Sequence, residues 1–288
     1  MKDFIIVTDS SCDLPVDIIK KHDIRVVPMC VTVNGKTCMH HYDFREMPNQ
    51  EFCEALKNGA KGSTAGTNIQ DAYNVMKNVA LEGKDIIFLS ISSGLSCSYQ
   101  NACLAAEDIK DEFPDIKVAI IDTRSVCVGV GLLIVYAAMA KERGRPFDEV
   151  VHLMDEYRHH VHHHFTVNDL DALSRSGRIS HTTAAVGSLL NIKPMLYIDS
   201  EGKVQSEGKT RGRKAAIKQL IDKTLHEVID SSVITIAHAD ALSDAEHIRA
   251  VLLEQLPAAE IIISDIGPVI GIHTGHQTLA VICLGEKR

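Results

Sequence analysis

The segment that most constrains the fold is residues 86–100, in which a continuous apolar run is followed by a serine-rich turn. Residues 86–91 show no polar alternation and are rich in β-branched side chains, which predicts a strand buried on both faces. In an open parallel sheet, ligands bind beyond the carboxyl ends of such strands. A helical pattern begins at Tyr99, so backbone N–H groups would face the same corner, which suits an anion. Alternatively, the serines only cap the helix and close the turn, and both interpretations stay open here.

The same pattern of a strand, a polar turn and a helix recurs in the first half of the chain. Strands are predicted at residues 4–7, 26–33 and 118–122, and Asn34-Gly35 is a strong hairpin signal. Hydroxyl or acidic residues fill the turns at 8–15, 62–67 and 123–125. Helices are predicted at residues 47–57, 71–81, 99–113 and 126–143. Strands that alternate with helices in this way predict a parallel α/β domain.

The pattern changes near residue 150. An ambiguous helix at 150–161 is followed by strands at 194–198, 203–206, 233–237, 261–264 and 278–284, with helices at 182–190, 214–229 and 244–256. We therefore expect a boundary at residues 155–165, with one domain over 1–157 and a mixed α/β domain over 158–288.

Composition excludes several classes of protein. The net charge of −8, the aromatic content of 5% and the absence of Trp argue against nucleic-acid binding. The longest nearly apolar run, residues 126–140, is shorter than the about 20 residues of a membrane span. Residues 1–10 carry Asp3 and Asp9 and do not resemble a signal peptide. Eight cysteines without a CxxC pair suit a reducing compartment, so we expect a cytoplasmic protein without integral membrane segments.

Two charged segments allow more than one interpretation. Residues 159–164 contain five histidines, and on a strand His160, His162 and His164 would share one face, which suits a transition metal. We favour an exposed polar segment at the domain junction and expect no metal site. The basic residues between 209 and 214 are either a solvated helix start or a docking patch for an acidic partner or an acyl phosphate.

Six short motifs in order along the chain resemble those of the DegV family of bacterial fatty-acid-binding proteins. The motifs are Thr8-Asp9-Ser10 with Asp13-Leu14-Pro15, residues 91–100 (ISSGLSCSYQ), Gly177-Arg178-Ile179-Ser180, Asn191-Ile192-Lys193-Pro194, Lys209 with Arg211-Gly212 and Lys214, and residues 271–275 (GIHTG). The resemblance covers the whole chain. Residues 63–67 (STAGT) depart from the TSQPS loop that relatives favour.

The resemblance implies a two-domain DegV-like fold, with a parallel α/β domain, a mixed α/β domain and a fatty-acid tunnel between them. In relatives, hydroxyls of two loops and a histidine hold the carboxylate. These roles fall on Ser63 with its neighbour Thr64, on Ser93 or Ser96, and on His273. The resemblance further assigns contacts with the head group or a partner to Arg178, Arg211 and Thr274.

Some family members present the bound acid to a separate ATP-binding kinase subunit, which forms the acyl phosphate. This chain has no GxxxxGK loop, so phosphoryl transfer would need such a partner. We expect a long-chain fatty acid as ligand and no cofactor.

The alternative is an enzyme. Hydroxyls and a histidine in one pocket also suit a serine-based lipid esterase or hydrolase. The GxSxG nucleophile elbow is absent around Ser93 and Ser96, which favours the non-catalytic carrier. Another amphiphilic acid as ligand stays open.

Overall fold

The computed structural model describes residues 2–179 and 191–288, and its first sheet is entirely parallel. The strand order is β2-β1-β6-β7. The strands are β1 (Phe4–Asp9), β2 (Arg25–Val27), β6 (Asp85–Ser90) and β7 (Val118–Asp122). All residues of β1 and β6 are buried, and for β6 the unbroken apolar run in the sequence predicted this burial. The parallel α/β architecture is therefore confirmed.

Helices cover both faces of this sheet. Ile5, Val7, Ile86 and Phe88 pack against α3 and α4 on one face, whereas Ile6, Ile87 and Leu89 belong to a core with α5 on the other. The helices of this region are α1 (Val16–Lys21), α3 (Ile69–Leu81), α4 (Ser98–Glu112), α5 (Val128–Glu142) and α6 (Phe147–Tyr157), with a short 3-10 turn η1 (Ser10–Cys12) after β1.

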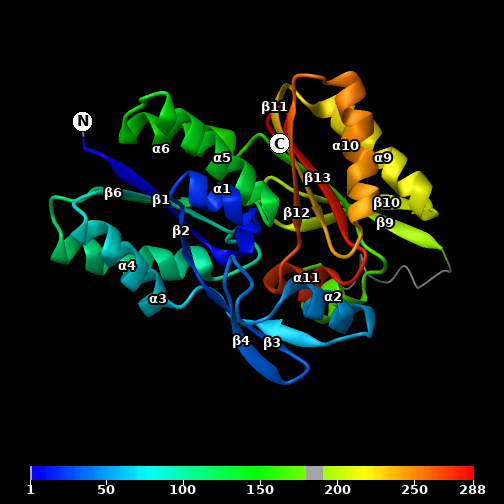
Figure 1. Ribbon diagram of the computed structural model, residues 1–288, viewed down its shortest axis with the longest axis horizontal. Coiled ribbons are helices and arrows are strands. Elements are labelled where there is room, and N and C mark those ends of the chain that lie inside the picture. Colours follow the sequence, from blue (N-terminus) through cyan, green and yellow to red (C-terminus); the bar gives the residue numbers. More distant parts are fainter. Residues whose placement is uncertain (1, 180–190) are drawn as a thin grey trace.

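A second sheet of six strands lies beside the first (Figure 1). Its order is β10-β9-β8-β13-β11-β12, and only β11 and β12 run parallel, so the sheet is mixed. The strands are β8 (Val161–Thr166), β9 (Ile192–Ile198), β10 (Val204–Arg211), β11 (Asp230–His238), β12 (Glu260–Asp265) and β13 (Leu279–Leu284). Helices α9 (Arg213–Glu227) and α10 (Leu242–Gln255) pack on one face, and α7 (Asp171–Arg175) follows β8.

Helix α5 lies between the two sheets. It contacts β1 and β6 of the first sheet and β11 and β13 of the second, and one hydrophobic core runs through all of them. All its residues except Met139, Lys141 and Glu142 are buried. This position explains why the helix is apolar on every side, because it has almost no solvent-facing surface.

A third, small sheet has the order β4-β3-β5 and packs against α11 (Pro268–Thr274) and α2 (Asn49–Lys57). Its strands are β3 (Met29–Val33), β4 (Lys36–His40) and β5 (Gly62–Thr64). The hairpin turn predicted at Asn34-Gly35 is confirmed, since both residues have positive φ. Two other predictions were wrong. Pro28 divides the strand expected at residues 26–33 between two sheets, and the loop expected at 62–67 begins with β5.

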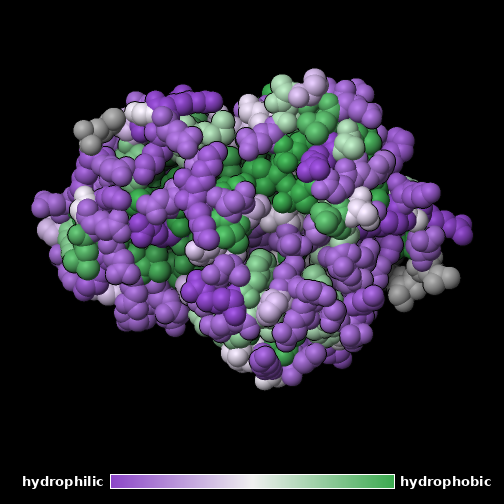
Figure 2. All heavy atoms as spheres, in the orientation of Figure 1, coloured by the Kyte–Doolittle hydropathy of each residue, from purple (hydrophilic) through white to green (hydrophobic). Residues whose placement is uncertain are grey.

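Hydrophilic residues cover most of the face shown in Figure 2, and hydrophobic residues show in several patches, of which the largest lies near the middle of the view. Among the residues that the structure describes, no helix combines the length and the apolar character needed to cross a bilayer. The helix expected at residues 182–190, and Ser180, lie outside the described residues.

Candidate functional site

A cavity of about 450 Å³ lies between the first and second sheets. Its walls are mainly aliphatic and come from both halves of the chain. The apolar lining includes Met29, Ile91, Leu95, Val126, Phe165, Leu173, Val204, Ile266, Val269, Ile270, Ala280 and Ile282. The polar side chains among the lining residues are Thr64, Ser96, His163, Arg178, His273, Thr274 and Thr278. The cavity therefore combines a mainly apolar wall with a small set of hydrogen-bonding groups, as ligand sites do.

A direct contact between β5 and α11 forms the polar part of the cavity. Thr64 Oγ1 lies 2.8 Å from His273 Nε2, although the two residues are far apart in the sequence. Ser63, the first residue assigned to this role, is exposed and does not line the cavity. Successive side chains of a strand point to opposite faces, so only one of these two hydroxyls can face inward. The structure places Thr64 there.

His273 is neutral at physiological pH. Burial, and then the positive charges of Arg178 and Arg175, lower the pKa of His273 to about 4. Its Nδ1 atom is buried and has no hydrogen-bond partner among the described residues. A neutral imidazole carries one N–H. If the Thr64 hydroxyl donates to Nε2, Nδ1 carries the hydrogen and can donate it to a ligand.

The serine turn after β6 contributes one residue to the cavity. Ser96 lines it, and Ser96 Oγ lies 2.9 Å from Ser98 Oγ and accepts a hydrogen bond of 3.2 Å from the Ser98 amide. The loop that follows β5 packs closely against this serine turn. A Cβ atom on Gly66 would lie 2.5 Å from Cys97 Sγ and 3.4 Å from Ser96 Oγ. The absence of a side chain at Gly66 thus lets the loop that carries Thr64 reach the turn that carries Ser96.

The other serines of the turn have structural partners. Ser93 Oγ donates to Asp122 Oδ2 at 2.6 Å, and the Ser93 amide donates to Asp122 Oδ1 at 3.0 Å. Ser92 Oγ donates to the Gly202 carbonyl at 2.8 Å and so ties the first sheet to the turn between β9 and β10. Neither serine lines the cavity. Of the two candidates Ser93 and Ser96, the structure therefore brings only Ser96 to Thr64 and His273.

The three residues assigned to contacts with the head group or a partner lie in different places. Arg178 lines the cavity, and its guanidinium donates to the Ser176 carbonyl. Thr274 also lines the cavity, with its hydroxyl donating to the Ile270 carbonyl at 3.3 Å. Arg211 is exposed at the end of β10 and does not line the cavity.

Sequence reasoning missed a buried polar pair next to the cavity. Cys127, at the start of α5, lines the cavity and donates from Sγ to Asp13 Oδ2 at 3.0 Å. Burial raises the pKa of Asp13, which also lies 3.8 Å from His40 Nε2. The positive φ of Cys127 and Asp13 is not visible in the sequence, because neither residue is a glycine.

The histidine segment at 159–164 was also misjudged. Residues 161–164 of this segment form the start of β8, and His163 and His164 are only 3% exposed, so the expected exposed polar segment was wrong. The side chains alternate across the sheet. His163 lines the cavity, whereas His162 and His164 lie near Glu227 on the α9 side.

Comparisons with known proteins cover the whole chain. The family model described as "Uncharacterised protein, DegV family" matches residues 3–286. A DegV domain-containing protein of Clostridium perfringens is 37% identical over 100% of this chain and 99% of its own length.

Solved structures are similar over the same extent. A fatty-acid-binding DegV family protein of Thermus thermophilus has a TM-score of 0.86 and 29% identity, covering 99% of this chain and 100% of that one. A fatty-acid-binding DegV family protein of Streptococcus agalactiae has a TM-score of 0.84 and 25% identity, with both chains fully covered. The fatty acid kinase B3 protein of Streptococcus pneumoniae, loaded with linoleic acid, has the same fold at 21% identity and a TM-score of 0.85, covering 99% and 100%.

Proposed function

Because the chain belongs to the DegV family, we propose that it binds a long-chain fatty acid in the cavity between its two larger sheets. The observation that carries this proposal is the hydrogen-bonded pair of Thr64 and His273, which lies with Ser96 on a mainly aliphatic cavity. The fatty-acid-binding relatives from Thermus thermophilus and Streptococcus agalactiae support it.

The physical chemistry of the cavity suits such a ligand. A carboxylate loses its hydration on entry, which is unfavourable unless hydrogen-bond donors replace the water. The hydrogen-bonded pair of Thr64 and His273 would supply one donor, the Ser96 hydroxyl would supply another, and Arg178 would supply positive charge. Each hydrogen bond to a charged head contributes about 1.5 to 3 kcal/mol net. A tail of about 14 methylenes contributes roughly 11 kcal/mol before ordering costs. The tail would therefore set affinity, and the head group would set orientation.

We further propose that the protein presents the acid to a separate ATP-binding kinase subunit, as the resemblance implies. The exposed Arg211 would lie on the docking face, while the cavity residue Arg178 would stay with the head group. Residues 1–157 and 158–288 are proposed as the two domains, because α6 ends at Tyr157 and β8 begins at Val161. The cytoplasmic location stays a prediction.

A hydrolase fits the hydrogen bonds less well. In the part of the chain that the structure describes, the Ser96 hydroxyl bonds to Ser98, and His273 bonds to Thr64. The charged groups that act on the pKa of His273 are two arginines, and no carboxylate among the described residues orients its imidazole as a general base. Turnover of a nitrophenyl ester that vanishes in Ser96→Ala would reverse this preference.

The alternating strand β5 provides the sharpest test of the proposed site. Thr64→Val removes the inward hydroxyl and keeps the side-chain volume, so we expect delipidated protein to bind a long-chain fatty acid at least about tenfold more weakly. Ser63→Ala removes the neighbouring outward hydroxyl and should change affinity by less than about twofold. Calorimetric titration measures both variants.

Native mass spectrometry of the purified protein tests the ligand class independently. We expect a copurified acyl chain that is released on denaturation. If the delipidated protein binds no fatty acid, the proposed function is wrong. If it binds equally well in both variants, the head group lies elsewhere.

A further inference from the structure

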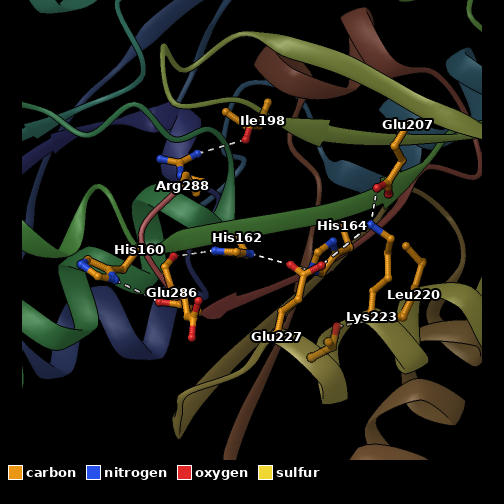
Figure 3. A network of polar contacts seen from close by, with 12 residues as sticks. His160, His162, His164, Ile198, Glu207, Leu220, Lys223, Glu227, Glu286 and Arg288 are labelled. Carbon is orange, nitrogen blue, oxygen red and sulfur yellow. Dashed lines mark hydrogen bonds and ion pairs between the residues drawn. The ribbon is translucent and has the colours of Figure 1, made fainter.

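The histidines of β8 and a glutamate of α9 form a cluster outside the cavity. His162, His164 and Glu227 each offer one ligand atom, and these atoms all lie within 4.8 Å of one another. Figure 3 shows the Glu227 carboxylate reaching from α9 toward the two imidazoles on β8. We propose that these three side chains bind one divalent first-row transition-metal ion, with Zn²⁺ as the best-suited member of the class.

The hydrogen bonds of His162 leave a position between its Nδ1 atom and Glu227 Oε2 that a proton or a metal ion must fill. His162 Nε2 lies 2.8 Å from the Glu286 carbonyl oxygen, which can only accept, so this nitrogen carries a hydrogen. His162 Nδ1 lies 2.5 Å from Glu227 Oε2. Two lone pairs cannot face each other at that distance, so either a second proton or a metal ion must lie there. A backbone carbonyl bonded to the far ring nitrogen is the usual partner of a metal-binding histidine.

His164 adds a second nitrogen without a competing partner. It is 3% exposed, and its Nδ1 atom has no hydrogen-bond partner among the described residues. Its Nε2 lies 3.2 Å from the same oxygen, Glu227 Oε2. Ligands about 2.0 to 2.1 Å from a tetrahedral ion are about 3.4 Å apart, so this pair is already close to the required spacing. For His162, the carboxylate would move back by about 1 Å.

The surroundings of the Glu227 carboxylate leave it room to move and leave room for the ion. Lys223 pairs with Glu207, and its Nζ lies 3.9 Å from Oε1 of Glu227, whereas both imidazoles pair with Oε2. The lysine charge is thus neutralised by another carboxylate. The cluster lines a cavity of about 420 Å³ that can admit a water molecule as fourth ligand. Two imidazoles and a carboxylate with one open position form a ligand set typical of zinc.

The test uses the untagged full-length protein, because a polyhistidine tag would bind the same ions. After dialysis against a chelator, the protein is titrated with Co²⁺, whose visible absorption is intense in four-coordinate sites. We expect one Co²⁺ per chain, displaced by Zn²⁺. Glu227→Gln and His164→Gln should each weaken binding at least about tenfold. Zn²⁺ should also raise the Tm of the wild type.

His226→Ala is the matched control, because His226 is exposed and adjacent to Glu227 on α9. It should bind Co²⁺ as the wild type does. Glu227→Gln preserves side-chain size, so it decides the outcome if the His164 variant does not fold. The proposal is overturned if the wild type shows no stoichiometric four-coordinate spectrum, if Glu227→Gln binds normally, or if His226→Ala loses binding to the same degree. In each case His162, His164 and Glu227 do not form the metal site.

Discussion

Two histidine sites in this protein differ in the sign of the charge around them. His273 lies beside a hydroxyl and near Arg178 and Arg175, and it has no carboxylate partner among the described residues. His162 and His164 both face the Glu227 carboxylate. The environment of His273 favours an anionic ligand, whereas the environment of His162 and His164 requires a cation. The comparison shows that the charges brought to an imidazole by the fold, and not the imidazole itself, select the ligand.

Reversing the charge at His273 should break this difference with the largest effect. His273→Asp removes a donor and places a negative group beside the proposed carboxylate, and such like-charge contacts cost several kcal/mol. We expect fatty-acid affinity at pH 7.5 to fall by about a thousandfold or more, measured by calorimetry on delipidated protein. Co²⁺ binding at the other site should be unchanged.

His247→Asp is the control, since His247 is exposed on α10 and far from either set of ligands in the sequence. It should bind the fatty acid normally. An equally tight complex with His273→Asp would mean that the head group does not approach this histidine.

The second prediction concerns pH and stability. The folded-state pKa of His273, about 4, lies below its ordinary value of 6.5 because burial disfavours the charged form. The unfolded chain therefore binds the proton more readily, and the stability contribution is present above pH 6.5 and lost as the pH falls toward 4. The shift corresponds to about 3 kcal/mol at most. Urea unfolding of delipidated wild type and His273→Gln should show this extra loss only in the wild type, and parallel pH profiles would contradict it.

The smallest effect is expected for Arg178→Gln, which sharpens the comparison by removing charge without touching His273. The pKa of His273 should rise, since the guanidinium lowers it, and fatty-acid binding should weaken about tenfold. An NMR titration of the His273 imidazole measures its pKa, and calorimetry measures the affinity for the fatty acid. Arg175→Gln is the matched control, because Arg175 is exposed and does not line the cavity. It should raise the pKa but leave affinity nearly unchanged. Equal affinity losses would indicate a long-range effect of charge alone.

Local patterns were sufficient for much of the architecture. The unbroken apolar run at residues 86–91 predicted a doubly buried strand, and β6 is one, because only strands between two helical layers lack a polar face. Asn34-Gly35 predicted the β3–β4 hairpin because its turn needs two residues with positive φ. The all-apolar α5 was recognisable as a buried helix, although its position between two sheets was not.

Which neighbouring side chain faces the site was decided by the tertiary structure. Ser63 and Thr64 have similar chemistry, and only the pairing of β5 with β3 turns Thr64 toward His273. Ser93 and Ser96 are likewise equivalent in the sequence, but the Ser93 hydroxyl donates a hydrogen bond to Asp122 on the next strand. Glu227 joins His162 and His164 because α9 packs on the mixed sheet. Residue types and their periodicity therefore determined the elements and the chemical inventory. Contacts between distant segments determined the site, since register and packing depend on the whole chain.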